Sequence, residues 1–111
     1  MTAKRRVVIT GLGAVTPFGI GTDKFWNSLV EGKSGISTSE LIDVSKHVVK
    51  ISGEVKNFNP DEYLDPKEAK KMDRFMQFAM IAADEAIKDA KLEEVNDVDP
   101  YKIGVVVSSA A

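Results

Sequence analysis

Two runs made mostly of consecutive apolar residues stand near opposite ends of the chain, at residues 7–9 and 103–107. Apolar residues at successive positions, rather than alternate ones, are typical of a strand buried on both faces of a sheet. Gly11 and Gly13 follow the first run and let the backbone turn sharply or pass close to another element. Pro17 keeps this loop from continuing directly into a helix. The pattern predicts a central strand at each run, the first of which leads into a glycine-containing loop.

Apolar residues recur at helical spacing in residues 24–30, which predicts a short helix covering one side of the sheet. Thr22 or Asp23 is expected to cap its first free amides. Gly32 suits the left-handed position just past its end.

A long helix is predicted from about Pro66 to Lys91, because Asp65 can cap it and proline suits its first position. Its apolar stripe consists of Ala69, Met72, Phe75, Met76, Ala79, Met80, Ala83, Ala86, Ile87 and Ala90. The alanines allow close approach of whatever packs on it, and the methionines suit a core or a subunit contact better than a cofactor pocket.

Between these elements, residues 33–39 are predicted to be a turn-rich connection and residues 48–55 an exposed or edge strand. Residues 61–64 suit a single helical turn, and residues 93–102 form a polar linker. This order predicts an α/β fold. In a βαβ order a covering helix should follow the strand at 103–107, so we expect the chain to be part of a larger domain.

Composition narrows the classes of function. Apolar residues make up 43% of the 111 residues and charged residues 29%, which is typical of a soluble globular chain. A net charge of −2 gives no general attraction to nucleic acid or to an anionic membrane, and we expect a cytoplasmic protein that binds neither. There is no cysteine, and His47 is the single histidine, so we expect no disulfide, metal or cofactor.

The motifs offer little catalytic chemistry. Gly11-Leu12-Gly13 lacks the third glycine of a dinucleotide fingerprint, since Thr16 stands in its place. Ser108 and Ser109 end a predicted strand, but His47 has no sequence link to them as a base, and it is expected to be a loop residue. The acidic pairs at residues 84–85 and 93–94 are expected to be solvated.

A basic strip stands out in this slightly acidic chain. Lys67, Lys70, Lys71 and Arg74 follow one another at spacings of three and four, which places them on one face of the predicted helix. Such a strip is either an ordinary charged helix face or a landing site for an acidic partner.

Several of these segments together closely resemble the start of the β-ketoacyl-[acyl-carrier-protein] synthases, in particular the type II condensing enzyme of fatty-acid synthesis. The matching segments are residues 5–19, Trp26, 32–36, 53–59, 67–79 and 103–109. The resemblance implies part of a thiolase-like layered αβαβα fold, with the amino-terminal half incomplete. It implies that residues 1–111 are the amino-terminal segment of a ketoacyl synthase domain whose full form is usually a homodimer.

The resemblance also implies an activity. Family members elongate an acyl chain by decarboxylative condensation of malonyl-carrier protein with an acyl group held on a cysteine, assisted by two histidines. All three residues lie beyond Ala111 in the family's order, so we expect these 111 residues alone to be inactive. The family uses no cofactor for this step.

Two sites are implied residue by residue. The basic helix face that meets the acidic acyl carrier protein corresponds to Lys67, Lys70 and Lys71. The position that gates the acyl pocket, often isoleucine, corresponds to Ala111, because the usual Gly-Ser-Gly-Ile reads Ser-Ser-Ala-Ala at residues 108–111. An alanine there is expected to leave the pocket wider.

Three alternatives stay open on the residues alone. A polyketide ketosynthase fits the same segments, and so does the non-catalytic chain-length partner of one, because the cysteine that separates them is not in this chain. A free-standing small α/β binding module has only the glycine loop in its favour.

Overall fold

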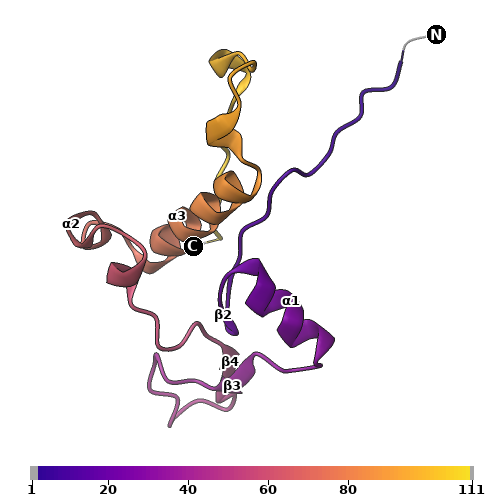
Figure 1. The fold of residues 1–111 in the computed structure, drawn as a ribbon. Coiled ribbons are helices and arrows are strands. Elements are labelled where there is room, and N and C mark those ends of the chain that lie inside the picture. Colours follow the sequence, from indigo (N-terminus) through magenta and orange to yellow (C-terminus); the bar gives the residue numbers. More distant parts are fainter. Residues whose placement is uncertain (1–2, 111) are drawn as a thin grey trace.

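The computed structural model describes residues 3–110 of the chain. Three helices, α1 (Thr22–Val30), α2 (Pro66–Ala69) and α3 (Arg74–Asp89), carry most of the regular structure (Figure 1). Two small antiparallel sheets accompany them: β1 (Val15–Thr16) pairs with β2 (Gly19–Ile20), and β3 (Ile36–Thr38) pairs with β4 (Ile51–Gly53). Short 3₁₀ turns are η1 (Pro60–Glu62), η2 (Leu92–Glu94) and η3 (Pro100–Lys102).

The glycine loop lies directly against α3, which is the second of the two roles that the sequence leaves open for Gly11 and Gly13. A β-carbon on Gly11 would overlap the carbonyl oxygen of Ala86, and one on Gly13 would overlap that of Ala82. Neither glycine has a positive φ, so both are needed for close approach rather than for a special backbone conformation. The small alanines of α3 provide the other half of this contact.

Two carboxylates of α3 bind the same loop. Glu85 accepts hydrogen bonds from the backbone N–H of Ala14 (2.9 Å) and of Thr22 (2.8 Å), and from the Thr22 hydroxyl (3.0 Å). Asp89 accepts one from the N–H of Leu12 (3.0 Å). The prediction of a solvated acidic pair at residues 84–85 is therefore wrong for Glu85, because its partners lie about 70 residues away in the sequence.

The start of α1 also differs from the prediction. Gly21 occupies the capping position and neither Thr22 nor Asp23 caps the helix with its side chain. Instead Glu85 of α3 binds the N–H of Thr22, so another element adds a negative charge at the helix start to that of Asp23 in the first turn. Gly32 has a φ of +69°, which confirms its left-handed position past the helix end.

The long helix predicted from Pro66 to Lys91 is broken into α2 and α3. Its start is confirmed, because Asp65 Oδ1 accepts hydrogen bonds from the N–H groups of Lys67 and Glu68. Residues 70–73 leave the helix through tight bonds over three residues, such as that from the N–H of Met72 to the carbonyl of Ala69 (3.1 Å). Tertiary contacts of the first turn of α3 override the helix propensity of this stretch.

The predicted strands are mostly wrong as local assignments. Residues 7–9 and 103–107 form no ladder, and their valines are exposed, with Val7 at 92% and Val106 at 96%. A strand needs a neighbour for its backbone hydrogen bonds, and within residues 3–110 neither segment has one. The strand predicted over 48–55 shrinks to β4, and its partner β3 lies in the predicted turn-rich connection. The helical turn predicted near residues 61–64 is confirmed as η1, one residue earlier.

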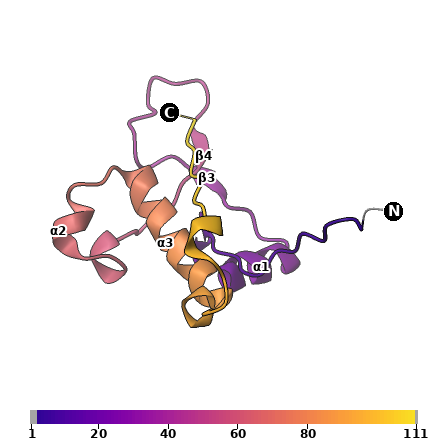
Figure 2. The ribbon, with the colours of Figure 1, turned by 90° about the horizontal axis from the view of Figure 1, so that it is seen from above.

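The described chain is elongated, and its own buried core is small. Its radius of gyration is 17.8 Å, whereas a compact domain of about 100 residues has about 13 Å. The N-terminal segment runs away from the rest, and the C-terminal segment passes along α3 (Figures 1 and 2). Among the described residues the buried ones are Ala69, Ile81 and Ser28. Large apolar side chains of the α3 stripe, such as Phe75 and Met80, are 43% and 50% exposed.

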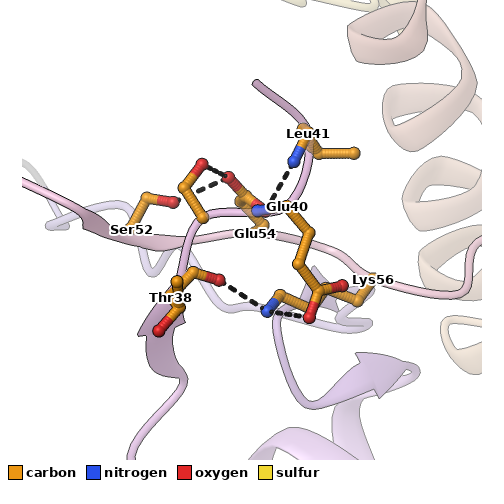
Figure 3. A network of polar contacts seen from close by, with 7 residues as sticks. Thr38, Glu40, Leu41, Ser52, Glu54 and Lys56 are labelled. Carbon is orange, nitrogen blue, oxygen red and sulfur yellow. Dashed lines mark hydrogen bonds and ion pairs between the residues drawn. The ribbon is translucent and has the colours of Figure 1, made fainter. Parts of the chain in front are cut away.

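A polar network closes the hairpin of β3 and β4 (Figure 3). Glu54 accepts hydrogen bonds from the hydroxyls of Ser39 and Ser52 and from the N–H groups of Glu40 (2.9 Å) and Leu41 (3.3 Å). The Ser39 hydroxyl and then the Glu40 amide lower the pKa of Glu54 to about 2. The carboxylate is thus held in its charged form by donors alone.

None of the helices in residues 3–110 has the length and apolar character that a membrane crossing requires.

Candidate functional site

The basic segment, defined here as residues 67–71, begins as a capped turn of helix. Asp65 Oδ1 lies 3.0 Å from the N–H of Lys67 and 3.1 Å from that of Glu68, and Pro66 takes the first helical position. Ala69 points inward and is 2% exposed. The inward alanine and the cap fix which way the neighbouring side chains face.

The three lysines of this segment are all exposed. Lys71 pairs with Glu68 at 2.9 Å, with the two side chains 70% and 58% exposed, so the pair is weak and easily exchanged. Lys67 and Lys70 form no ion pair with any residue in the described part of the chain. The segment therefore presents positive charge that the chain itself leaves largely uncompensated.

Arg74, which the sequence places in the same strip, has turned away from it. Its guanidinium lies over the rings of Phe58 and Phe78, 5.4 and 5.0 Å from their centroids, and it donates a hydrogen bond to the carbonyl of Val55. The two rings meet edge to face at 5.0 Å. The prediction of a four-residue basic strip is wrong at Arg74, because the break before α3 directs this side chain inward, where it packs by cation–π contact.

Gln77 is a residue that the sequence analysis missed. Its side-chain amide donates to the carbonyl of Ala69 (3.0 Å) and makes a longer bond to that of Met72 (3.4 Å). These carbonyls flank Lys70 and Lys71. The only signal in the sequence is one polar amide beside the apolar stripe of α3, which gives no indication of its partners.

The other candidate residues form no reaction centre in the described chain. His47 is exposed in the loop between β3 and β4, as predicted. Ser108 lies in the exposed C-terminal segment. Within residues 3–110 no three His, Cys, Asp or Glu side chains are grouped to hold a metal ion. Ala111, the predicted acyl-pocket position, lies outside the described residues.

An apolar groove of about 330 Å³ runs along α3. Its lining comes from α3, one residue shortly before it and the C-terminal segment: Met72, Phe75, Met76, Ala79, Met80, Ala83, Val105 and Val107. Hence the segment predicted as a strand at residues 103–107 lies against the apolar stripe of α3, even though it forms no ladder.

Comparison with known protein families assigns the chain to a class. The family model described as "Beta-ketoacyl synthase, N-terminal domain" matches residues 4–111. The chain belongs to this family of beta-ketoacyl synthase N-terminal domains.

Individual relatives narrow the assignment. The chain is 45% identical over 106 residues to the 3-oxoacyl-[acyl-carrier-protein] synthase 2 of Synechocystis sp., which covers 96% of this chain and 25% of that protein. It is 44% identical over 109 residues to the protein of the same name from Staphylococcus aureus strain N315, covering 98% of this chain and 26% of that protein. The chain thus spans about a quarter of the length of these relatives.

A solved structure is similar as well. The ishigamide ketosynthase/chain length factor matches with a TM-score of 0.71 and 31% identity, over 80% of this chain and 22% of that one. Together with the family match, this confirms the resemblance and the fold class predicted from the sequence, a part of the thiolase-like α/β fold.

Proposed function

We propose that this chain is part of a 3-oxoacyl-[acyl-carrier-protein] synthase, an acyltransferase of fatty-acid biosynthesis, and that its basic segment binds the acyl carrier protein. Support for the reaction comes from the relatives of that name, at 44–45% identity over nearly the whole chain. Support for the surface comes from one observation above all: Lys67 and Lys70 are exposed and unpaired within residues 3–110, on a segment fixed to α3.

In this proposal the chain contributes recognition and the longer polypeptide contributes the chemistry. Malonyl-carrier protein loses carbon dioxide, and the resulting enolate attacks an acyl thioester on a cysteine, whose thiolate then leaves. Two histidines stabilise the developing oxyanions. The present chain has no cysteine, so its 111 residues alone are expected to catalyse no condensation.

Lysines on a surface act mainly on encounter and orientation. Acyl carrier proteins are acidic, so exposed lysines attract them over roughly a Debye length, about 8–10 Å at physiological salt. Each exposed contact contributes about 0–1 kcal/mol, and three acting together are enough to orient a partner. The bound carrier protein would then be oriented so that its thioester reaches the active site of the enzyme.

Further parts of the proposal rest on the sequence resemblance. Ala111 would line the acyl pocket, where an alanine leaves more room than the usual isoleucine. The complete enzyme would be a homodimer in the cytoplasm, without a cofactor.

The test is a condensation assay of the polypeptide at the length of its relatives, with the three lysines changed to glutamate. We expect the KM for carrier-bound substrate to rise at least about tenfold, while turnover of a small thioester without the carrier stays unchanged. An unchanged KM for the carrier-bound substrate would contradict the proposed surface.

A second candidate is a polyketide ketosynthase or its non-catalytic chain-length partner. The structural match to a ketosynthase/chain length factor favours keeping it, although its identity of 31% is lower than that of the fatty-acid relatives. The polypeptide beyond this chain distinguishes the candidates, since a non-catalytic partner would lack the acyl-accepting cysteine.

A further inference from the structure

The basic segment is held by very little helix of its own. Its helix, α2, has four residues, and a helix this short is not stable in isolation. The positions of Lys70 and Lys71 therefore depend on contacts with other elements. The contact that touches both ends of this pair is the side-chain amide of Gln77, one turn into α3.

We propose that Gln77 is a positioning residue that fixes the direction of Lys70 and Lys71 for carrier-protein binding. This inference rests on the proposed function, since it concerns how the same surface is presented. Gln77 itself touches no partner in the proposal. It acts through the backbone carbonyls on either side of the two lysines.

The geometry suits a primary amide in particular. A glutamine amide has two N–H donors, and here the nitrogen faces two carbonyl oxygens, at 3.0 Å on Ala69 and 3.4 Å on Met72. Both carbonyls lie where α2 has ended. The Ala69 carbonyl also accepts the N–H of Met72 (3.1 Å), so the Gln77 amide is its second donor, and the same amide reaches the Met72 carbonyl. A glutamate at this position would turn a carboxylate toward two carbonyl oxygens, and an apolar residue would leave both without this donor.

The residues around Gln77 restrict its motion, so that its hydrogen bonds can fix the direction of Lys70 and Lys71. Gln77 is half-buried, and its own N–H binds the carbonyl of Asp73 (3.1 Å), at the start of α3. Arg74, in the same turn, is held by its contacts with the rings of Phe58 and Phe78. A lysine pair that is already oriented loses less conformational entropy when a partner binds, so losing the Gln77 contact should weaken binding without changing any charge.

The experiment measures carrier-protein affinity and steady-state kinetics of the full-length polypeptide with Gln77→Met, which keeps the length of the side chain and removes its donors. We expect the Kd and the KM for carrier-bound substrate to rise roughly threefold to tenfold, the scale of losing neutral hydrogen bonds. The kcat with a small thioester should stay unchanged. Asn27→Met, which replaces an exposed amide on α1, is the matched control and should change neither value.

A double-mutant cycle separates positioning from general stability. In a background with Lys70 and Lys71 changed to alanine, Gln77→Met should weaken binding no further, because the residues that it positions are gone. If Gln77→Met weakens binding equally in both backgrounds, the inference is overturned.

The remaining outcomes are equally decisive. If changing the lysines weakens binding but Gln77→Met does not, the inference fails and the proposed function stands. If neither change has an effect, the proposed function fails and the inference fails with it. Should Gln77→Met not fold, Gln77→Asn, which stays polar but is one methylene shorter, carries the same expectation. Failure of both variants to fold would overturn the inference, since Gln77 would then serve overall stability.

Discussion

The two halves of α3 hold their neighbours with opposite chemistry. In the C-terminal half, the acceptors Glu85 and Asp89 bind backbone N–H groups of residues 12–22. In the N-terminal half, the donors Arg74 and Gln77 bind backbone carbonyls of residues 55–72. One helix thus fixes two irregular segments, in each case through hydrogen bonds to backbone groups of the segment.

This difference in chemistry distinguishes the loop at residues 11–22, which packs tightly against α3, from the basic segment, which stays exposed. The loop at residues 11–22 is bound by charge and by direct backbone contact at its glycines, and it packs close to the helix. The basic segment is bound by a neutral amide, that of Gln77, and its lysines stay exposed. Changes in the first half should therefore act on stability. In the second half, a change at Gln77 should act on binding, whereas a change at Arg74, which contacts Val55, Phe58 and Phe78, should act on stability.

The largest change in the free energy of unfolding is expected at Gly13, where the backbone of α3 leaves no room for a β-carbon. Gly13→Ala should destabilise the fold by roughly 3 kcal/mol, because the new β-carbon would overlap the backbone carbonyl of Ala82 rather than a flexible side chain. Urea unfolding of the full-length polypeptide measures this loss. Gly104→Ala is the control, since a β-carbon there meets no atom within 4 Å. Equal midpoints for the two variants would contradict the close contact.

The next effect is expected at Glu85. Partial burial alone raises the pKa of Glu85, but hydrogen bonds from Thr22 and Ala14 outweigh it and lower the pKa overall. Glu85→Ala should cost roughly 2–3 kcal/mol of unfolding free energy, because two part-buried N–H groups lose a charged acceptor. Asp84→Ala, which removes only an exposed pair with Lys88, should cost about 0.5 kcal/mol or less. A loss at Asp84 as large as that at Glu85 would refute the special role of Glu85.

A smaller effect is expected at Arg74, in the donor half. Arg74→Lys keeps the charge but loses the planar group that lies over Phe58 and Phe78, so stability should fall by about 1 kcal/mol. Thermal unfolding would record the change, with Lys67→Arg on the exposed segment as a neutral control. A fully stable Arg74→Lys protein would mean that charge alone is needed at this position.

The smallest effect is local and concerns the hairpin. The pKa of Glu54 is lowered to about 2 by its donors, beginning with Ser39. A carboxylate with a lowered pKa stabilises the fold fully above its unfolded value of about 4.3 and progressively less as pH falls toward 2. The protection factors of the Glu40 and Leu41 amides, which divide the exchange rate of an unstructured chain at the same pH by the measured rate, should therefore fall over this pH range, because Glu54 binds both N–H groups. In Glu54→Gln the protection factors should be low already at neutral pH, and a persistent decrease with falling pH in this variant would point to another group.

Whether the sequence predicts a contact of α3 depends on how far apart in the sequence the contacting residues lie. Short-range signals succeeded where they were specific: Asp65 before Pro66 predicted the helix start. Gly11 and Gly13 indicated either a sharp turn or a close approach, and the structure shows the close approach. The contacts of Glu85 and Gln77 could not be read from any pattern, because their partners are set by how α3 meets the rest of the chain.

The strand predictions failed for a related reason. The valines of residues 7–9 and 103–107 have the composition of a buried strand, but composition does not supply the neighbouring strand that completes a ladder. The break in the long helix was missed because residues 67–91 contain no glycine and no further proline that would mark it, and the contacts of Arg74 and Gln77 become visible only in the structure. The candidate lysines were found from their spacing and supported by the family resemblance, whereas Arg74 was assigned to their strip from spacing alone.

The most direct test of the central claim, that the basic segment receives an acidic carrier protein, is the carrier affinity of the full-length polypeptide at low and high salt. We expect Lys67, Lys70 and Lys71 changed together to glutamate to weaken binding at least about tenfold at low salt and to remove most of the salt dependence. The control changes the exposed Lys33, Lys46 and Lys102 to glutamate, which alters the net charge equally. The account predicts near-parental binding for this control, and equal weakening in both triple variants would contradict a localised carrier surface.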